Sequence, residues 1–154
     1  MEMKKKHSIV SEISDIISQE LIENALGGGC LFSTALLFEE LERRGIESRI
    51  ICGSVMYDSE VKNHYIPVHF WVTVDNKIYD PTLKVTRHFA GQMGIENVEY
   101  KYINKVFLSR FSDLLMIRSA EDIKHSRNTD NYFSKAPENV LNIRRSVFSR
   151  AKEV

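Results

Sequence analysis

Apolar residues in the first part of the chain recur at spacings of three and four, which is the period of a helix that buries one face. The pattern predicts one helix over 8–26 and a second over 30–44, separated by three glycines at 27–29. Consecutive glycines favour a turn because each can adopt backbone angles that other residues avoid. Gly45 stands where a glycine commonly ends a helix. We therefore expect two helices joined by a short turn.

The pattern then changes to β-branched and apolar residues typical of strands. Strands are expected over 49–57, 68–74 and 77–82, with a polar loop over 58–67. Asp75 and Asn76 both tolerate positive φ, so we expect them to form a two-residue hairpin turn. Pro81 is expected to end the third strand or to place it at a sheet edge.

The last part of the chain has a weaker pattern. We expect a strand over 98–108, a short helix or strand over 112–119, a polar loop over 125–135 and a helix over 137–152 that begins at a proline. Helices followed by a mainly antiparallel sheet and a final helix indicate an α+β fold. At 154 residues, the chain has the length of one domain, which we expect to span 1–154.

Charge and hydropathy argue against several partners. The 21 lysines and arginines balance the 21 aspartates and glutamates, so no long-range field attracts nucleic acid or anionic lipid. No apolar run approaches the roughly 20 residues that cross a bilayer. Acidic residues interrupt the region where a cleavable signal peptide would need to be apolar. We expect a cytoplasmic protein, although export by another route stays open, and the oligomeric state is not indicated.

The most informative junction is Cys30 directly after the three glycines, at the start of the second helix. A helix N-terminus supplies positive partial charge and free N–H groups, both of which favour a reactive thiolate. The same N–H groups can stabilise the oxyanion of a tetrahedral intermediate. Cys52 lies in a strand among apolar residues and is expected to be a buried structural thiol. The two cysteines and the nearby histidines do not have the spacing of a zinc site, so no metal is expected.

A cysteine nucleophile needs a base, and the base needs a carboxylate that fixes its tautomer. His69 lies on one predicted strand and Asp80 on the next. If Asp75-Asn76 is a two-residue turn, Trp71 pairs with Asp80 and His69 with Thr82. Asp80 then shares a face with His69 at a diagonal distance that the two side chains can span. A three-residue turn without a bulge would put them on opposite faces.

These segments together resemble a known family. The resemblance rests on four segments. They are a helix that begins with Cys-Leu and runs into Arg-Arg-Gly-Ile, a strand that ends near Gly53, the run His-x-Trp-Val, and the run Asp-Asn-Lys-Ile-Tyr-Asp. They are similar to the transglutaminase-like core of the papain-like cysteine enzymes, and in particular to the small bacterial branch that includes lasso-peptide leader peptidases. The resemblance covers about 27–82, the expected catalytic core, with 83–154 as additional strands and helices. It implies a nucleophile helix packed on an antiparallel sheet, thioester chemistry and no cofactor or metal. Carried over, the nucleophile is Cys30, the base and acid His69, and the orienting carboxylate Asp80.

Other residues are candidates for supporting roles. His64 is an alternative base, although it lies in the predicted loop. Asn24, and less so Gln19, are spaced before the cysteine like the oxyanion-hole glutamine of papain-like enzymes. Gly29 and Trp71 are expected to wall the site.

The expected activity is cleavage of an amide bond in a peptide or protein substrate by a thiol peptidase. A glutamine deamidase, a transglutaminase or acyltransferase, and a non-catalytic binding module that keeps the fold remain as alternatives. The three enzymes share one thioester intermediate. They differ in the amide that the thiolate attacks or in the group, water or an amine, that resolves the thioester.

Overall fold

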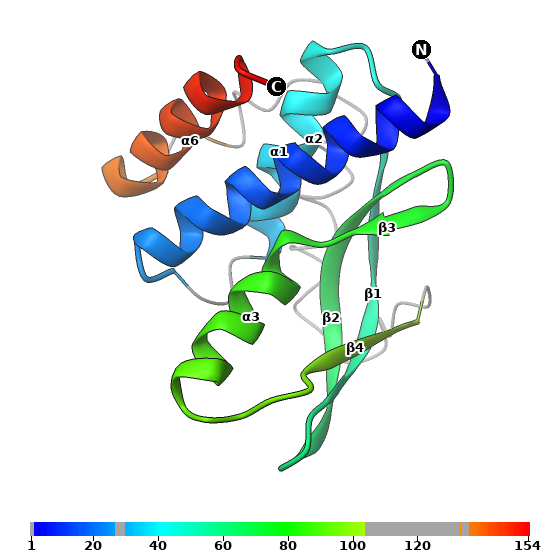
Figure 1. Ribbon diagram of the computed structural model, residues 1–154, viewed down its shortest axis with the longest axis vertical. Coiled ribbons are helices and arrows are strands. Elements are labelled where there is room, and N and C mark those ends of the chain that lie inside the picture. The colour runs from blue at the N-terminus through cyan, green and yellow to red at the C-terminus, as the bar shows by residue number, and fades with distance from the viewer. Residues whose placement is uncertain (1, 27–29, 104–132, 134–135) are drawn as a thin grey trace.

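The elements are arranged as helices packed against one sheet (Figure 1). The computed structural model describes residues 2–26, 30–103, 133 and 136–154. These residues form, in chain order, α1 (Met3–Glu23), α2 (Cys30–Arg43), β1 (Arg49–Asp58), β2 (Asn63–Val74), β3 (Lys77–Tyr79), α3 (Pro81–Gln92), β4 (Glu99–Ile103) and α6 (Glu138–Ala151). The predicted α+β class is confirmed. The expectations for 112–119 and for nearly all of 125–135 lie outside the described residues.

The four strands form an antiparallel sheet in the order β3-β2-β1-β4. The predicted loop over 58–67 is wrong in its second half, because β2 begins at Asn63 and pairs with the end of β1. Polar residues occur there because this end of the hairpin is exposed, so neither face imposes an apolar alternation. The pairing of β1 with β2 shifts between Gly53 and Val55. Pro67, which has no N–H to donate, lies in β2 at this irregularity.

The segment after β3 is a helix, where a strand to Thr82 was predicted. The prediction was wrong because β3 ends at Tyr79 and α3 begins at Pro81. Asp80 is the N-cap of α3 and Pro81 its first residue, an arrangement that suits proline because the first N–H of a helix has no intrahelical partner. The Asp-Pro pair therefore starts a helix at the edge of the sheet.

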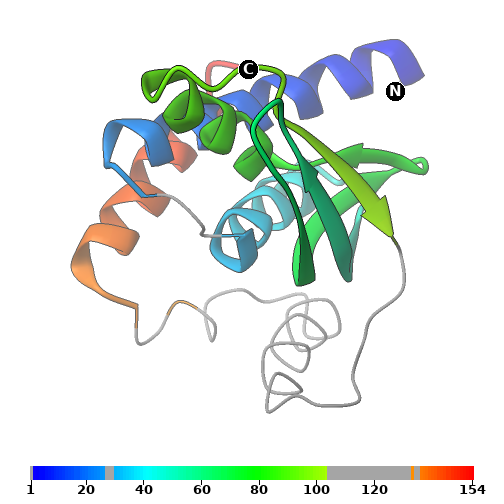
Figure 2. The ribbon, with the colours of Figure 1, turned by 90° about the horizontal axis from the view of Figure 1, so that it is seen from below.

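The main core lies between the sheet and three helices. Figure 2 shows α2 between the sheet and α6. Buried apolar residues of α1, α2 and α6 pack with one face of the strands, where Phe70, Val72 and Val74 of β2 are almost fully buried. Since α2 occupies this position, its first residue, Cys30, is brought toward β2.

Two buried glutamates attach α6 to the other helices. Glu39 of α2 accepts hydrogen bonds from Arg144 Nε and Nη2 at 2.9 and 2.7 Å. Glu20 of α1 accepts one from Arg150 Nη1 at 3.0 Å and another from Ser146. Burial of a carboxylate is costly unless it is paired and hydrogen-bonded. The pairs therefore fix where α6 docks.

Candidate functional site

The hairpin between β2 and β3 sets the positions of His69 and Asp80. Asp75 and Asn76 have φ of 50° and 66°, as the two-residue turn requires. Val74 pairs with Lys77 as predicted, and the pairing continues as far as Val72 with Tyr79. The chain leaves the ladder after Tyr79, so the predicted pairs of Trp71 with Asp80 and His69 with Thr82 are not among those formed.

The two side chains nevertheless meet. His69 Nε2 lies 2.7 Å from Asp80 Oδ2, and both side chains are buried, with 6% and 2% of their surface exposed. An even-numbered turn keeps Asp80 on the face of His69. The carboxylate reaches the ring from the N-cap position of α3.

Asp80 is held from both sides. Its Oδ1 accepts hydrogen bonds from the Thr82 N–H at 3.1 Å and from Thr82 Oγ1 at 2.6 Å. Its Oδ2 accepts a hydrogen bond from the Tyr102 hydroxyl at 3.0 Å, in addition to the one from His69. A carboxylate that is bonded in this way has one orientation, with Oδ2 toward the imidazole.

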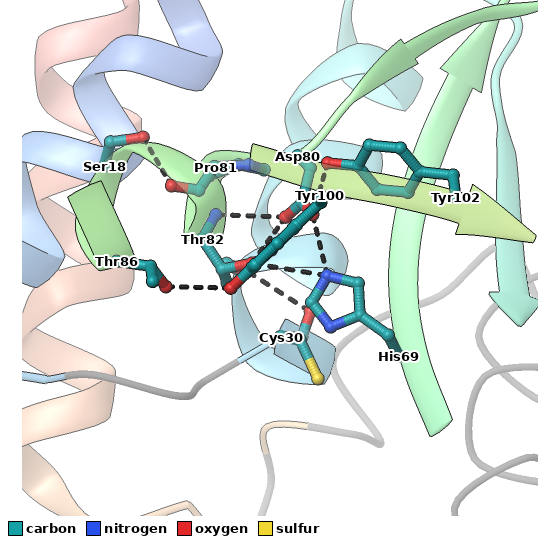
Figure 3. A network of polar contacts seen from close by, with 10 residues as sticks. Ser18, Cys30, His69, Asp80, Pro81, Thr82, Thr86, Tyr100 and Tyr102 are labelled. Atoms are coloured by element: carbon teal, nitrogen blue, oxygen red, sulfur yellow. Dashed lines mark hydrogen bonds and ion pairs between the residues drawn. The ribbon is translucent and has the colours of Figure 1, made fainter. Parts of the chain in front are cut away.

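Cys30 lies on the opposite side of the imidazole. It is the first residue of α2 and is half-buried. Figure 3 shows its sulfur on the Nδ1 side of the His69 ring, while Nε2 faces Asp80. Cys30 is also among the groups that raise the pKa of His69. Thiol, imidazole and carboxylate therefore lie in line, contributed by α2, β2 and the start of α3.

The surroundings change the proton affinity of His69. Burial alone lowers the pKa of the imidazole, because it disfavours the charged form. The hydrogen bond to Asp80 and the nearby Cys30 outweigh burial and raise the pKa of His69 to about 9. The site therefore favours the protonated form of the ring, which can donate from both nitrogens.

Aromatic rings enclose His69 on the sheet. Trp71 is fully buried, with its ring centroid 5.9 Å from that of His69. Tyr100 packs edge-on against His69 at 5.3 Å, and Tyr102 packs edge-on against Trp71 at 5.0 Å. Trp71 thus lies beside the imidazole of His69, and its role as a wall of the site stays a prediction. Such surroundings exclude water from the buried ion pair.

The other candidates lie elsewhere or outside the described residues. His64 is in β2 and stacks on Tyr57 at 4.8 Å. Asn24 caps α1 and donates from Nδ2 to the Glu20 carbonyl at 2.8 Å, and the exposed Gln19 donates to Glu23 at 3.1 Å. Asn24 and Gln19 are thus bonded within their own helix. Gly29 lies outside the described residues.

Two neighbours of Asp80 were missed at the level of sequence. Thr82 carries a recognisable signal, because Asp-Pro-Thr places an acceptor two residues before a hydroxyl and an N–H at a helix start. Tyr102 carries only its alternation with Tyr100, which puts both rings on one face of a strand. That β4 pairs with β1 and not with β3 depends on a chain reversal through α3. No local pattern shows this.

Comparison with known proteins identifies no relative. No protein-family model, no curated protein and no solved structure matches the chain. Among the described residues, no group of three or more His, Cys, Asp or Glu side chains is arranged to hold a metal ion. Within the same residues, no helix has the length and apolar character that a membrane span needs.

Proposed function

We propose that the chain is a cysteine-dependent hydrolase that cleaves an amide bond of a peptide or protein through a thioester, on a transglutaminase-like, papain-like core. The observation that supports this most is the line formed by Asp80, His69 and Cys30. The carboxylate fixes the imidazole by one nitrogen, and the other nitrogen meets a half-buried thiol at a helix N-terminus. A buried ion pair of this kind is also found where it only stabilises a fold, but such a role does not need the thiol.

The first half of the reaction forms the thioester. His69 takes the proton of Cys30, which leaves a thiolate and an imidazolium stabilised by Asp80. The thiolate attacks the amide carbonyl, and the first N–H groups of α2, which have no partner within the helix, stabilise the oxyanion. His69 then returns the proton to the leaving nitrogen, the C–N bond breaks, and the amine departs.

The second half releases the acyl group. His69, now neutral, takes a proton from a water molecule that attacks the thioester carbonyl. The tetrahedral intermediate collapses, the C–S bond breaks, and Cys30 recovers its proton from His69. The products are a carboxylic acid and an amine, and no cofactor is consumed. A primary amide of glutamine in place of the backbone amide would give deamidation, and an amine in place of water would give acyl transfer.

The proposal is tested with an activated ester, which needs no knowledge of the natural substrate. Mixed with p-nitrophenyl acetate, the protein is expected to release a burst of nitrophenol and to carry an acetyl thioester on Cys30, seen by peptide mass spectrometry. Cys30→Ala is expected to abolish the burst. Cys52→Ala is the matched control, because it removes the other thiol, and it should retain the burst. Acetylation of neither thiol, or of Cys52 alone, would contradict the proposal.

The type of reaction is then determined from the products that the protein forms from a peptide mixture. Incubation with a peptide mixture is expected to yield new N-termini with the parent protein and none with Cys30→Ala. Conversion of glutamine to glutamate without cleavage would replace the peptidase by a deamidase, and isopeptide products would replace it by a transglutaminase.

A further inference from the structure

The Asp80 carboxylate has more hydrogen-bond donors than a histidine orienter needs. Among the described residues it accepts four hydrogen bonds, two at each oxygen. The pair at Oδ2 is the informative one, because Tyr102 Oη at 3.0 Å and His69 Nε2 at 2.7 Å share the same atom. Figure 3 shows both groups directed at this oxygen from different strands.

Tyr102 is placed so that its hydroxyl remains a donor. Its strand, β4, pairs Tyr102 with Val55 of β1, and its ring packs against Trp71. Burial and then the negative charge of Asp80 raise the pKa of the phenol above its ordinary value. The phenol is therefore protonated at any pH where the protein would work, and its proton lies toward the carboxylate.

Asp80 is held by other hydrogen bonds besides that of Tyr102. The two bonds from Thr82 hold Oδ1, and the imidazole itself meets Oδ2. The contribution of Tyr102 is therefore to the charge on Oδ2. A second donor at one oxygen stabilises the negative charge there and weakens the hydrogen bond between that oxygen and the first donor.

We propose that Tyr102 is a positioning residue of this site, which acts through Asp80: its hydroxyl draws charge from Oδ2 and thereby makes the His69 imidazolium a stronger acid. The role rests on the proposed function, because acid strength matters where His69 must give a proton to a leaving amine. General acids work best with a pKa near the operating pH. With the pKa of His69 already raised to about 9, any further rise would make it a poorer acid.

Several groups near the ring also bear on its titration. Asp80 and Cys30 face its two nitrogens, and Tyr100 packs on its edge. Besides burial, the charge of Tyr57 raises the pKa of Tyr100. Burial also raises the pKa of Tyr102, and the charge of Arg87 in α3 lowers it. A useful variant must leave all of these unchanged.

Tyr102→Phe meets this condition, and Tyr100→Phe is its matched control. Both variants keep an aromatic ring in β4, but the Tyr100 hydroxyl bonds Thr86 Oγ1 at 2.9 Å and not the carboxylate. The pKa of His69 would be followed by NMR from the carbon-bound protons of the ring between pH 5 and 11, with thermal unfolding as a check of the fold. We expect Tyr102→Phe to raise this pKa by about 0.5–1 unit, and Tyr100→Phe to leave it unchanged.

An unchanged or lowered pKa in folded Tyr102→Phe would overturn the proposal, as would an equal rise in Tyr100→Phe. Should Tyr102→Phe fail to fold, 3-fluorotyrosine at position 102 keeps the ring and the hydroxyl and makes this hydroxyl a stronger donor to Oδ2. The pKa of His69 is then expected to fall, and an unchanged or raised pKa would overturn the proposal. Because the titration needs no substrate, its result is independent of whether acetylation of Cys30 is observed.

Discussion

Replacing Asp80 by asparagine exchanges one carboxylate oxygen for an NH₂ group with almost no change of shape. The hydrogen bonds around the side chain decide which oxygen is lost. The Thr82 backbone N–H can only donate, so it requires an oxygen at the position of Oδ1. The new NH₂ group must therefore take the place of Oδ2, where it faces His69 Nε2. A donor at that position makes Nε2 an acceptor and puts the ring proton on Nδ1.

The tautomer that results is the wrong one for the proposed reaction. With its proton on Nδ1, the side facing Cys30, His69 cannot accept the proton of the thiol. The same exchange in a serine triad lowers kcat by about 10⁴ through the same tautomer change. We expect a loss on the order of 10³–10⁴ in the rate of Cys30 acetylation.

The effect on the imidazolium follows from its pKa. The rise from 6.5 to about 9 corresponds to roughly 3 kcal/mol in favour of the charged ring. The hydrogen bond to Asp80 is the largest of the contributions that raise it. A facing carboxylate changes a pKa by about 1–3 units, so Asp80→Asn should lower the pKa of His69 by that amount. The cap of α3 should be kept, because asparagine caps a helix about as well as aspartate. Below pH 6.5, however, stability should fall by about 1–4 kcal/mol, because the lower His69 pKa removes the stabilisation of the charged ring.

The assay combines NMR titration of His69 with the rate of Cys30 acetylation. Asp75→Asn is the matched control, since it makes the same exchange on the same hairpin at a residue paired with Lys6. It should leave both readings unchanged. If Asp80→Asn keeps both the His69 pKa and the acetylation rate of the parent, the carboxylate does not orient the imidazole and the reasoning fails.

Three further outcomes are expected. Gly53→Ala should cost about 1–3 kcal/mol in chemical denaturation, because its Cβ would overlap the Ile103 carbonyl and lie 2.6 Å from Trp71 Cη2; unchanged stability would show that β4 can move aside. Glu39→Gln should cost about 1–3 kcal/mol and speed proteolysis at α6, since it weakens the bidentate bond with Arg144; an unchanged cleavage rate would contradict this role. Amide hydrolysis should decline as the pH rises through about 9, because His69 loses the proton it gives to the amine; a rate still rising at higher pH would exclude it as the acid.

The parts of the fold that local patterns determine were predicted well. α2 and β1 begin where their apolar periodicity begins, and the turn at Asp75-Asn76 has the residues its backbone angles require. Periodicity failed at Asn63 to Pro67, because an exposed hairpin end has no buried face to impose alternation. It failed again at Pro81, where the start of a helix was mistaken for the end of a strand.

The candidate site was predictable where it depends on one hairpin and one helix start. The two-residue turn predicted His69 and Asp80 on one face, and the two side chains do meet, although Asp80 reaches the ring from the N-cap of α3. The hydrogen bond that Tyr102 donates to the Asp80 carboxylate depends on longer-range structure. Tyr102 reaches Asp80 because β4 pairs with β1 on the side away from β2, and no spacing in the chain shows this pairing.

The most direct measurement is the alkylation rate of each cysteine by iodoacetamide as a function of pH, in the parent protein and in His69→Ala. If His69 and Cys30 form the proposed ion pair, Cys30 should react faster than a free thiol near pH 6, and faster than Cys52. The excess should disappear in His69→Ala. A rate at Cys30 that matches a free thiol and does not change when His69 is removed would contradict the proposal of an activated nucleophile.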